Sequence, residues 1–149
     1  MACGNREPAA DGGAAAAHYS GTIRRVADLV TNDVQWADWS IRQLDAAALK
    51  GPLLINDVVY AELSVRFAAI ETLEDALDEV AISLAAIPRA ALFLAGRAFQ
   101  RYRAAGGSRT GVLPGFFIGA HAAVAGVPLQ TRDARRYRNY FPSVGLLTP

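Results

Sequence analysis

The sequence has little cysteine, little lysine and no long apolar run, and each shortage excludes a class of protein. Cys3 is the only cysteine in 149 residues, so neither an intrachain disulfide nor a cysteine-based zinc site is possible. Because a chain without disulfides suits a reducing compartment, we expect a cytoplasmic protein. No stretch of about 18 residues is both apolar and uncharged, so we expect no membrane span. The length and the 52% apolar content predict a folded domain rather than a disordered chain.

Acidic residues are almost missing from the second part of the chain. Residues 1–87 carry 13 acidic and 6 basic residues, a formal charge of −7, whereas residues 88–149 carry 9 arginines and one acid, Asp133, a formal charge of +8. Arginine binds phosphate through a planar fork of donors, so this part of the chain favours a polyanionic partner. A solubilising surface in a chain with one lysine, Lys50, explains the same composition, and charge alone leaves both interpretations open.

The N-terminal segment lacks the residues that build a core. Residues 1–22 contain no valine, leucine, isoleucine or phenylalanine, and alanine and glycine dominate. Such a segment buries too little apolar surface to offset the entropy lost on ordering. We therefore expect a disordered tail over residues 1–17 and a single domain over residues 18–149.

The remaining sequence alternates between helical and strand patterns. Apolar spacing, glycine and proline positions predict helices over residues 23–30, 36–49, 57–70, 72–80, 88–105, 114–125 and 134–140, and strands over residues 53–55, 82–87, 127–131 and 144–147. Strands that alternate with helices indicate an α/β layer structure with a parallel sheet.

Two acidic residues follow predicted strands. Glu62 lies in the helix after the strand at 53–55, and Asp133 comes two residues after Thr131. Binding sites in parallel sheets lie at the carboxyl ends of the strands. Carboxylates there can hold Mg²⁺ or Mn²⁺, and the metal activates water for attack on a phosphodiester. Acids near helix starts also complement the helix dipole, so the pair alone does not decide between the two interpretations.

Other chemistries have little support in the sequence. There is no G-x-S-x-G motif and no G-x-x-x-x-G-K-[ST] motif, so serine hydrolysis and nucleotide hydrolysis are disfavoured. His121 lies within an apolar helical run at 116–125, where we expect a core histidine rather than a catalytic base.

Three segments, AELS at 61–64, IGAHAAVAG at 118–126 and TRDARRY at 131–137, have an order and spacing that are jointly specific. With DLVTND at 28–33 and WADWS at 36–40, they make residues 28–149 resemble the PIN-domain ribonucleases of the VapC type, toxins of bacterial toxin–antitoxin pairs. The resemblance implies a PIN-like three-layer α/β fold with a mainly parallel sheet of four or five strands. It also implies an Mg²⁺- or Mn²⁺-dependent endoribonuclease that acts on RNA, forms a homodimer and is held inactive by a cognate antitoxin.

The resemblance also implies a metal site of about four carboxylates. Glu62 and Asp133 match two of them, and the neighbouring Arg132 is expected to contact phosphate. The third position, after Leu-Pro at the start of the buried helix, is Gly115 here, and the fourth, at the end of the first strand, falls near Thr22. The segment before it, AAAAHYS, is a poor central strand, so it either fills that place weakly or leaves it open.

Two functions remain open on this basis. The first is a VapC-like endoribonuclease whose activity is impaired in this chain, and the second is a degenerate PIN protein that binds antitoxin or RNA without cleavage. The number of carboxylates discriminates between them, because the affinity of a site for Mg²⁺ depends on its negative charge and oxygen ligands. Two of four acids remain, which favours weak metal binding. A generic α/β domain without a site is disfavoured by the joint match of the segments.

Overall fold

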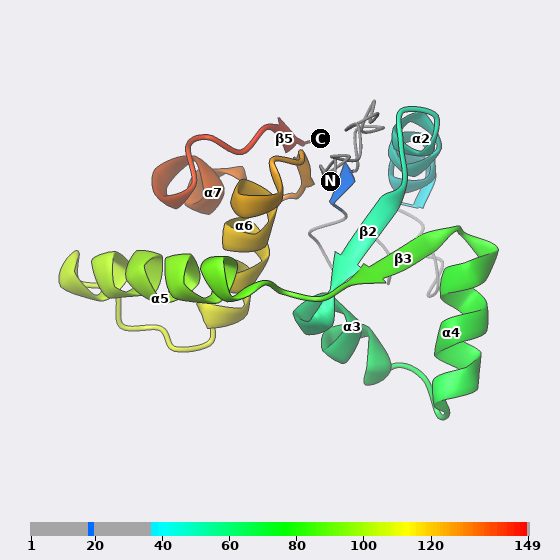
Figure 1. The fold of residues 1–149 in the computed structure, drawn as a ribbon, viewed down its shortest axis with the longest axis horizontal. Helices are drawn as coiled ribbons and strands as arrows, with labels where there is room; N and C mark the ends of the chain where they lie inside the picture. The colour runs from blue at the N-terminus through cyan, green and yellow to red at the C-terminus, as the bar shows by residue number, and fades with distance from the viewer. Residues whose placement is uncertain (1–17, 20–36, 149) are drawn as a thin grey trace, which may run out of the picture.

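The computed structural model describes residues 18–19 and 37–148 and has an α/β fold in three layers (Figure 1). Within these residues the sheet has five strands in the order β3-β2-β1-β4-β5, and each pairing is parallel. The strands are β1 (His18–Tyr19), β2 (Leu53–Asn56), β3 (Ile82–Ala85), β4 (Leu129–Gln130) and β5 (Leu146–Leu147). The predicted fold class, a parallel sheet of four or five strands flanked by helices, is confirmed.

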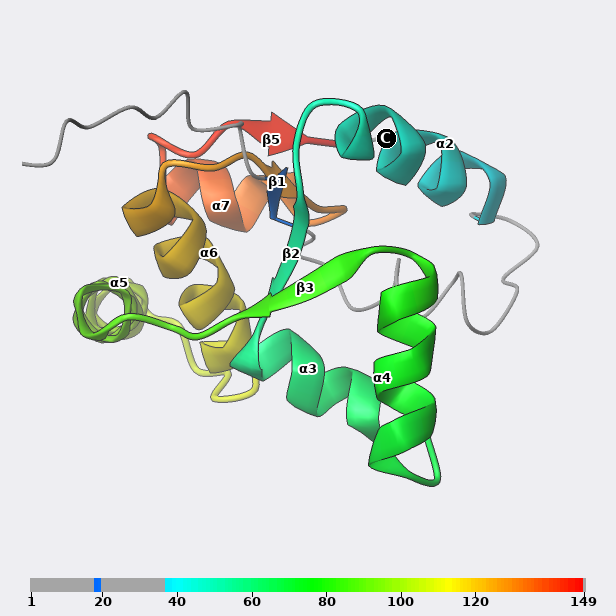
Figure 2. The same ribbon diagram turned by 45° about the vertical axis from the view of Figure 1, so that its right-hand side comes forward.

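Helices cover both faces of this sheet. They are α2 (Ala37–Ala48), α3 (Asp57–Ser64), α4 (Ile70–Glu79), α5 (Arg89–Ala104), α6 (Leu113–Ala125) and α7 (Ala134–Tyr140). In Figures 1 and 2, α5 and α6 lie on one side of β2 and β3, and α4 lies on the other side. None of the described helices combines the length and apolar content that a membrane-crossing helix needs.

The short strand β1 lies at the centre of the sheet. His18 and Tyr19 pair with Leu53 and Leu54 on one side, and Tyr19 pairs with Leu129 on the other. The central place is therefore filled, although by fewer residues than the three to ten of an ordinary strand. The expected tail over 1–17 and the expected helix over 23–30 lie outside the described residues.

Several predicted element boundaries are wrong: the strands expected over 127–131 and 144–147 are only two residues long each, and two other ends differ for identifiable reasons. The helix expected over 57–70 ends at Ser64. Ile70 is 60% exposed and begins a separate helix, α4. Residues 65–69 contain no glycine or proline that would mark a turn. The apolar spacing continues across them, and for this reason the sequence predicts one helix instead of two. The strand expected over 82–87 ends at Ala85, because the N–H of Ile87 donates to Oδ2 of Asp57 instead of to a neighbouring strand.

The junction of β2 and α3 is fixed by a buried asparagine. Asn56 is fully buried, has extended backbone angles, and accepts a hydrogen bond on Oδ1 from the N–H of Val59 at 3.0 Å. This is the side-chain cap that helix N-termini require, because their first N–H groups have no partner within the helix. Val59 and Leu63, both fully buried, then anchor the inner face of α3 in the core.

We expect Asn56→Ala to lower the free energy of unfolding by about 0.5–2 kcal/mol, because the N–H of Val59 then loses its acceptor. For a chain of this size, thermal unfolding should shift down by roughly 2–4 °C per kcal/mol. Asn56→Ser keeps a cap acceptor and should retain most of the stability. Equal melting temperatures for the alanine variant and the unmodified protein would show that the cap contributes nothing.

Helix α6 runs through the core beside α5, as its apolar sequence predicts. Phe116, Ala120 and Ala122 are fully buried, and His121 is 5% exposed. Burial lowers the pKa of His121, so the neutral imidazole is favoured there. The helix ends at Gly126, whose φ of 66° lies in the left-handed region that favours glycine.

Candidate functional site

Glu62 lies on α3 and is half-buried at the edge of the core. Burial raises the pKa of its carboxyl group, because desolvation disfavours the charged form. Its Oε2 atom is buried and has no hydrogen-bond partner among the described residues. A buried carboxylate oxygen without a donor is costly, so this atom has the chemistry to receive a proton or a cation.

Asp133 follows β4, and its N–H and both carboxylate oxygens have partners. Its N–H donates to Oγ1 of Thr131 at 3.0 Å, and its Oδ1 accepts from the N–H of Arg136 at 3.3 Å, which caps α7. Its Oδ2 lies 2.9 Å from Nη2 of Arg136. The carboxylate is therefore both a helix cap and one half of an ion pair.

Tyr137 is the residue that both carboxylates influence. Its ring is 3% exposed, and burial is the main cause of the raised pKa of its hydroxyl. The guanidinium of Arg136 opposes that rise, whereas the charges of Asp133 and Glu62 both add to it. Both acids therefore disfavour ionisation of the same hydroxyl.

Gly115 joins the same group of residues. A Cβ atom built on it would lie 3.6 Å from the Tyr137 hydroxyl and only 2.6 Å from Nη1 of Arg136. The space that a side chain at 115 would occupy is thus filled by a guanidinium. The structure brings Gly115 and Asp133 into contact with Arg136 beside Tyr137, and Arg136 is a residue that the sequence reasoning did not single out.

Two cavities next to this group are lined by arginine. One of about 280 Å³ lies between Tyr102, Asp133 and the start of α7, and one of about 550 Å³ lies along residues 108–112. Both are lined by Arg109, Val112 and Arg136, and the first also by Arg135. The excess of arginine after residue 88 was the only indication of these cavities in the sequence. It predicts a basic surface but does not tell which arginines line a cavity.

Arg132, the arginine that the sequence singled out for phosphate, lies elsewhere in this region. It follows β4, is half-buried, and is not part of the lining of either cavity. Arg132 precedes α7, whereas Arg135 and Arg136 lie in its first turn, and sequence position alone does not tell which of these arginines lines the cavity.

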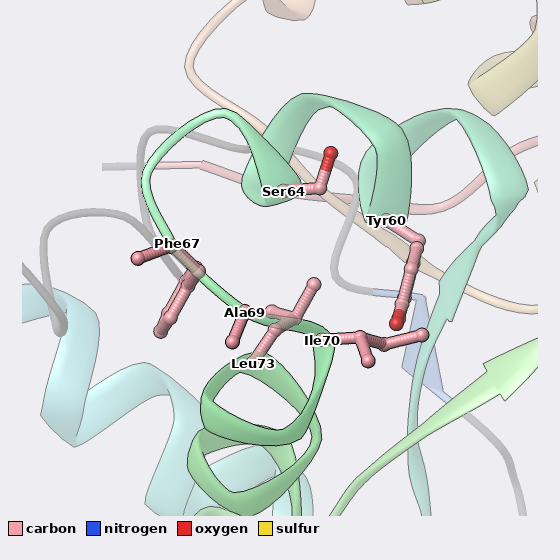
Figure 3. Close-up of a pocket in the computed structure, with 7 residues that line it drawn as sticks. Tyr60, Ser64, Phe67, Ala69, Ile70 and Leu73 are labelled. Carbon is pink, nitrogen blue, oxygen red and sulfur yellow. The ribbon is translucent and has the colours of Figure 1, made fainter.

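A third cavity, of about 200 Å³, lies where α3 turns into α4. Figure 3 shows Tyr60, Phe67, Ile70 and Leu73 gathered around it, and the hydroxyl of Tyr60 donates to Glu74. Its lining is mostly apolar and brings no pair of carboxylates together. This cavity suits contact with an apolar side chain rather than catalysis or metal binding.

The donor set of the described residues does not fit a divalent metal ion. No group of three or more histidine, cysteine, aspartate or glutamate side chains that could hold a metal occurs within residues 18–19 and 37–148. Mg²⁺ prefers an octahedron of oxygen ligands with net negative charge around it. Here one of the two carboxylates is paired with Arg136, and the same guanidinium lies against Gly115.

Comparisons with known proteins support the fold. No protein-family profile matches the chain, and no curated protein sequence matches it. Among solved structures, the crystal structure of VapBC2 from Rickettsia felis bound to a DNA fragment from their promoter is similar, with a TM-score of 0.67. The two share 15% sequence identity over 89% of this chain and 98% of that one. The predicted PIN-like, VapC-like fold is therefore confirmed.

Proposed function

We propose that this chain is a VapC-like PIN protein that binds RNA and a cognate antitoxin while its nuclease centre is impaired. The observation that carries the proposal is the position of Arg136, which pairs with Asp133 at 2.9 Å and fills the space beside Gly115. A fixed positive charge among the site residues opposes a divalent cation, and the neighbouring arginine-lined cavities favour a polyanion.

The proposed partners are an antitoxin and RNA. The similar structure is a VapBC2 complex bound to promoter DNA, and we propose that this chain likewise pairs with an antitoxin. RNA is the proposed polyanion, and a cytoplasmic homodimer is the proposed assembly. The apolar cavity between α3 and α4 offers a place where an apolar side chain of the antitoxin could dock.

The second candidate is an endoribonuclease that uses Mg²⁺ or Mn²⁺ weakly bound by Glu62 and Asp133. Its support is the buried Oε2 atom of Glu62, which has no hydrogen-bond partner among the described residues and would gain one ligand bond from a cation. In that case the cation competes with Arg136 for Asp133.

A fluorogenic RNA cleavage assay, paired with fluorescence polarisation of labelled RNA, separates the two candidates. We expect RNA binding that persists in EDTA and weakens with salt, and no cleavage that depends on Mg²⁺ or Mn²⁺. Asp78→Asn, on the exposed face of α4, is the charge-matched control for Asp133→Asn. Metal-dependent cleavage that is lost in Asp133→Asn and kept in Asp78→Asn would establish the second candidate.

A further inference from the structure

The arginine-lined cavities have an uneven balance of charge. We call the two cavities together the arginine hollow; its charged lining residues are Arg109, Asp133, Arg135 and Arg136. Arginine keeps its charge at any physiological pH, so three positive groups face one negative group. Because Asp133 already binds Arg136, the hollow retains about two unbalanced positive charges.

The loop that supplies Arg109 is held in place by Tyr102. The Tyr102 hydroxyl accepts a hydrogen bond from the N–H of Arg109 at 3.2 Å, and its carbonyl accepts from the N–H of Gly107 at 2.9 Å. Nη1 of Arg103 donates to the carbonyl of Ser108 at 3.2 Å. These three hydrogen bonds fix the backbone of the loop, so its position needs little further ordering when a ligand binds.

Arg136 is held from the opposite side of the hollow. Its Nη2 atom binds Asp133, and its Nη1 atom lies over Gly115, where no side chain intervenes. A guanidinium has five N–H donors, so one ion pair leaves others for a ligand. Its side chain is 30% exposed and lines both cavities, and those donors are therefore within reach of the hollow.

The neutral lining of the hollow also suits an anion. Ser108 and Thr110 supply hydroxyl groups and Asn139 supplies an amide, each of which can donate a hydrogen bond. Guanidinium groups bind phosphate in a bidentate manner with charge-assisted hydrogen bonds, which are the strong ones. A tetrahedral oxyanion is the ligand that matches this set of donors.

We infer that the arginine hollow is a phosphate-binding site that needs no divalent cation, with Arg109, Arg135 and Arg136 as its charged ligands. Arg136 stands at the position of a missing carboxylate, so this chain places a positive group where a metal site would need a negative one. The inference rests on the proposed function only in that RNA is the larger molecule that would carry the phosphate.

The test is titration calorimetry with inorganic phosphate and with pyrophosphate in buffer containing EDTA. We expect binding by the unmodified protein and a loss of affinity of about tenfold in Arg109→Gln and in Arg136→Gln. Arg89→Gln is the matched control, because Arg89 opens α5, thirteen residues before Tyr102, and should change the affinity less than about twofold. Arg109 is exposed and lies in a loop, so that variant keeps the fold even if Arg136→Gln does not.

Labelled oligoribonucleotides with and without a 5′-phosphate distinguish a terminal phosphate from an internal phosphodiester. Phosphate binding that requires Mg²⁺, or that is equal in Arg109→Gln and Arg89→Gln, would overturn the inference. If RNA binds and the Arg109→Gln and Arg136→Gln variants bind phosphate no more weakly than the unmodified protein, the phosphate site is wrong while the proposed function stands. If phosphate binds through Arg109 and RNA does not bind, the proposed function fails while the phosphate site stands.

Discussion

Replacing Gly119 with alanine will lower the free energy of unfolding by about 1–3 kcal/mol, the usual cost of overpacking a core. A Cβ atom on Gly119 would lie 2.5 Å from Cδ2 of Phe141 and 2.8 Å from Cδ1 of Tyr137. Both rings are at most 3% exposed, so neither can swing into solvent to make room. Relief requires a shift of α7 away from α6, and Tyr137 would move with it.

Gly96→Ala is the matched control for this substitution. Gly96 is also helical, in α5, but a Cβ atom there would meet nothing within 4 Å. Alanine at that exposed helical position should therefore stabilise the chain by about 0.5–1 kcal/mol. Urea unfolding followed by circular dichroism measures both variants. A Gly119→Ala protein as stable as Gly96→Ala would mean that the close approach of α6 and α7 is not a constraint on residue 119.

The elements that could be predicted from the sequence are those whose local pattern agrees with their tertiary environment. Helix α6 is apolar on all sides and buried, and the junction before α3 carries an asparagine that caps it. The end of α3 could not be predicted, because it depends on a turn over residues 65–69 that no glycine or proline marks. The sequence left open whether AAAAHYS fills the central strand position, and pairing with β2 and β4 shows that β1 fills it over two residues.

Some features of the candidate site could be predicted from the sequence and others could not. Glu62 and Asp133 follow strands in the sequence, and the parallel sheet brings the ends of those strands to one edge. The absence of an acid at Gly115 could also be read from the sequence. The residue that fills the space could not be predicted, because Arg136 reaches Gly115 from another helix while it pairs with Asp133. Such a contact is tertiary and leaves no local pattern.

Restoring an acid at position 115 should create a metal site only when Arg136 is removed as well. In Gly115→Asp alone, the new carboxylate would lie against Nη1 of Arg136, whose flexible end can shift to form a second ion pair. Such a pair neutralises the acid, so we expect little gain in Mn²⁺ affinity. Position 115 lies in the first turn of α6, where the helix dipole stabilises a negative charge.

The double variant Gly115→Asp/Arg136→Gln should bind Mn²⁺ about tenfold or more tightly than either single variant, because it adds a carboxylate and removes the guanidinium that contacts both position 115 and Asp133. Arg136→Gln alone releases Asp133 and should give an intermediate gain. Titration calorimetry with Mn²⁺ on the unmodified protein and the three variants forms a double-mutant cycle, in which contacting residues couple by roughly 0.5–3 kcal/mol. Thermal unfolding of each protein without metal checks that the fold is kept. Additive effects of the two substitutions, or a Gly115→Asp protein that binds Mn²⁺ as tightly as the double variant, would show that Arg136 is not the group that opposes the cation.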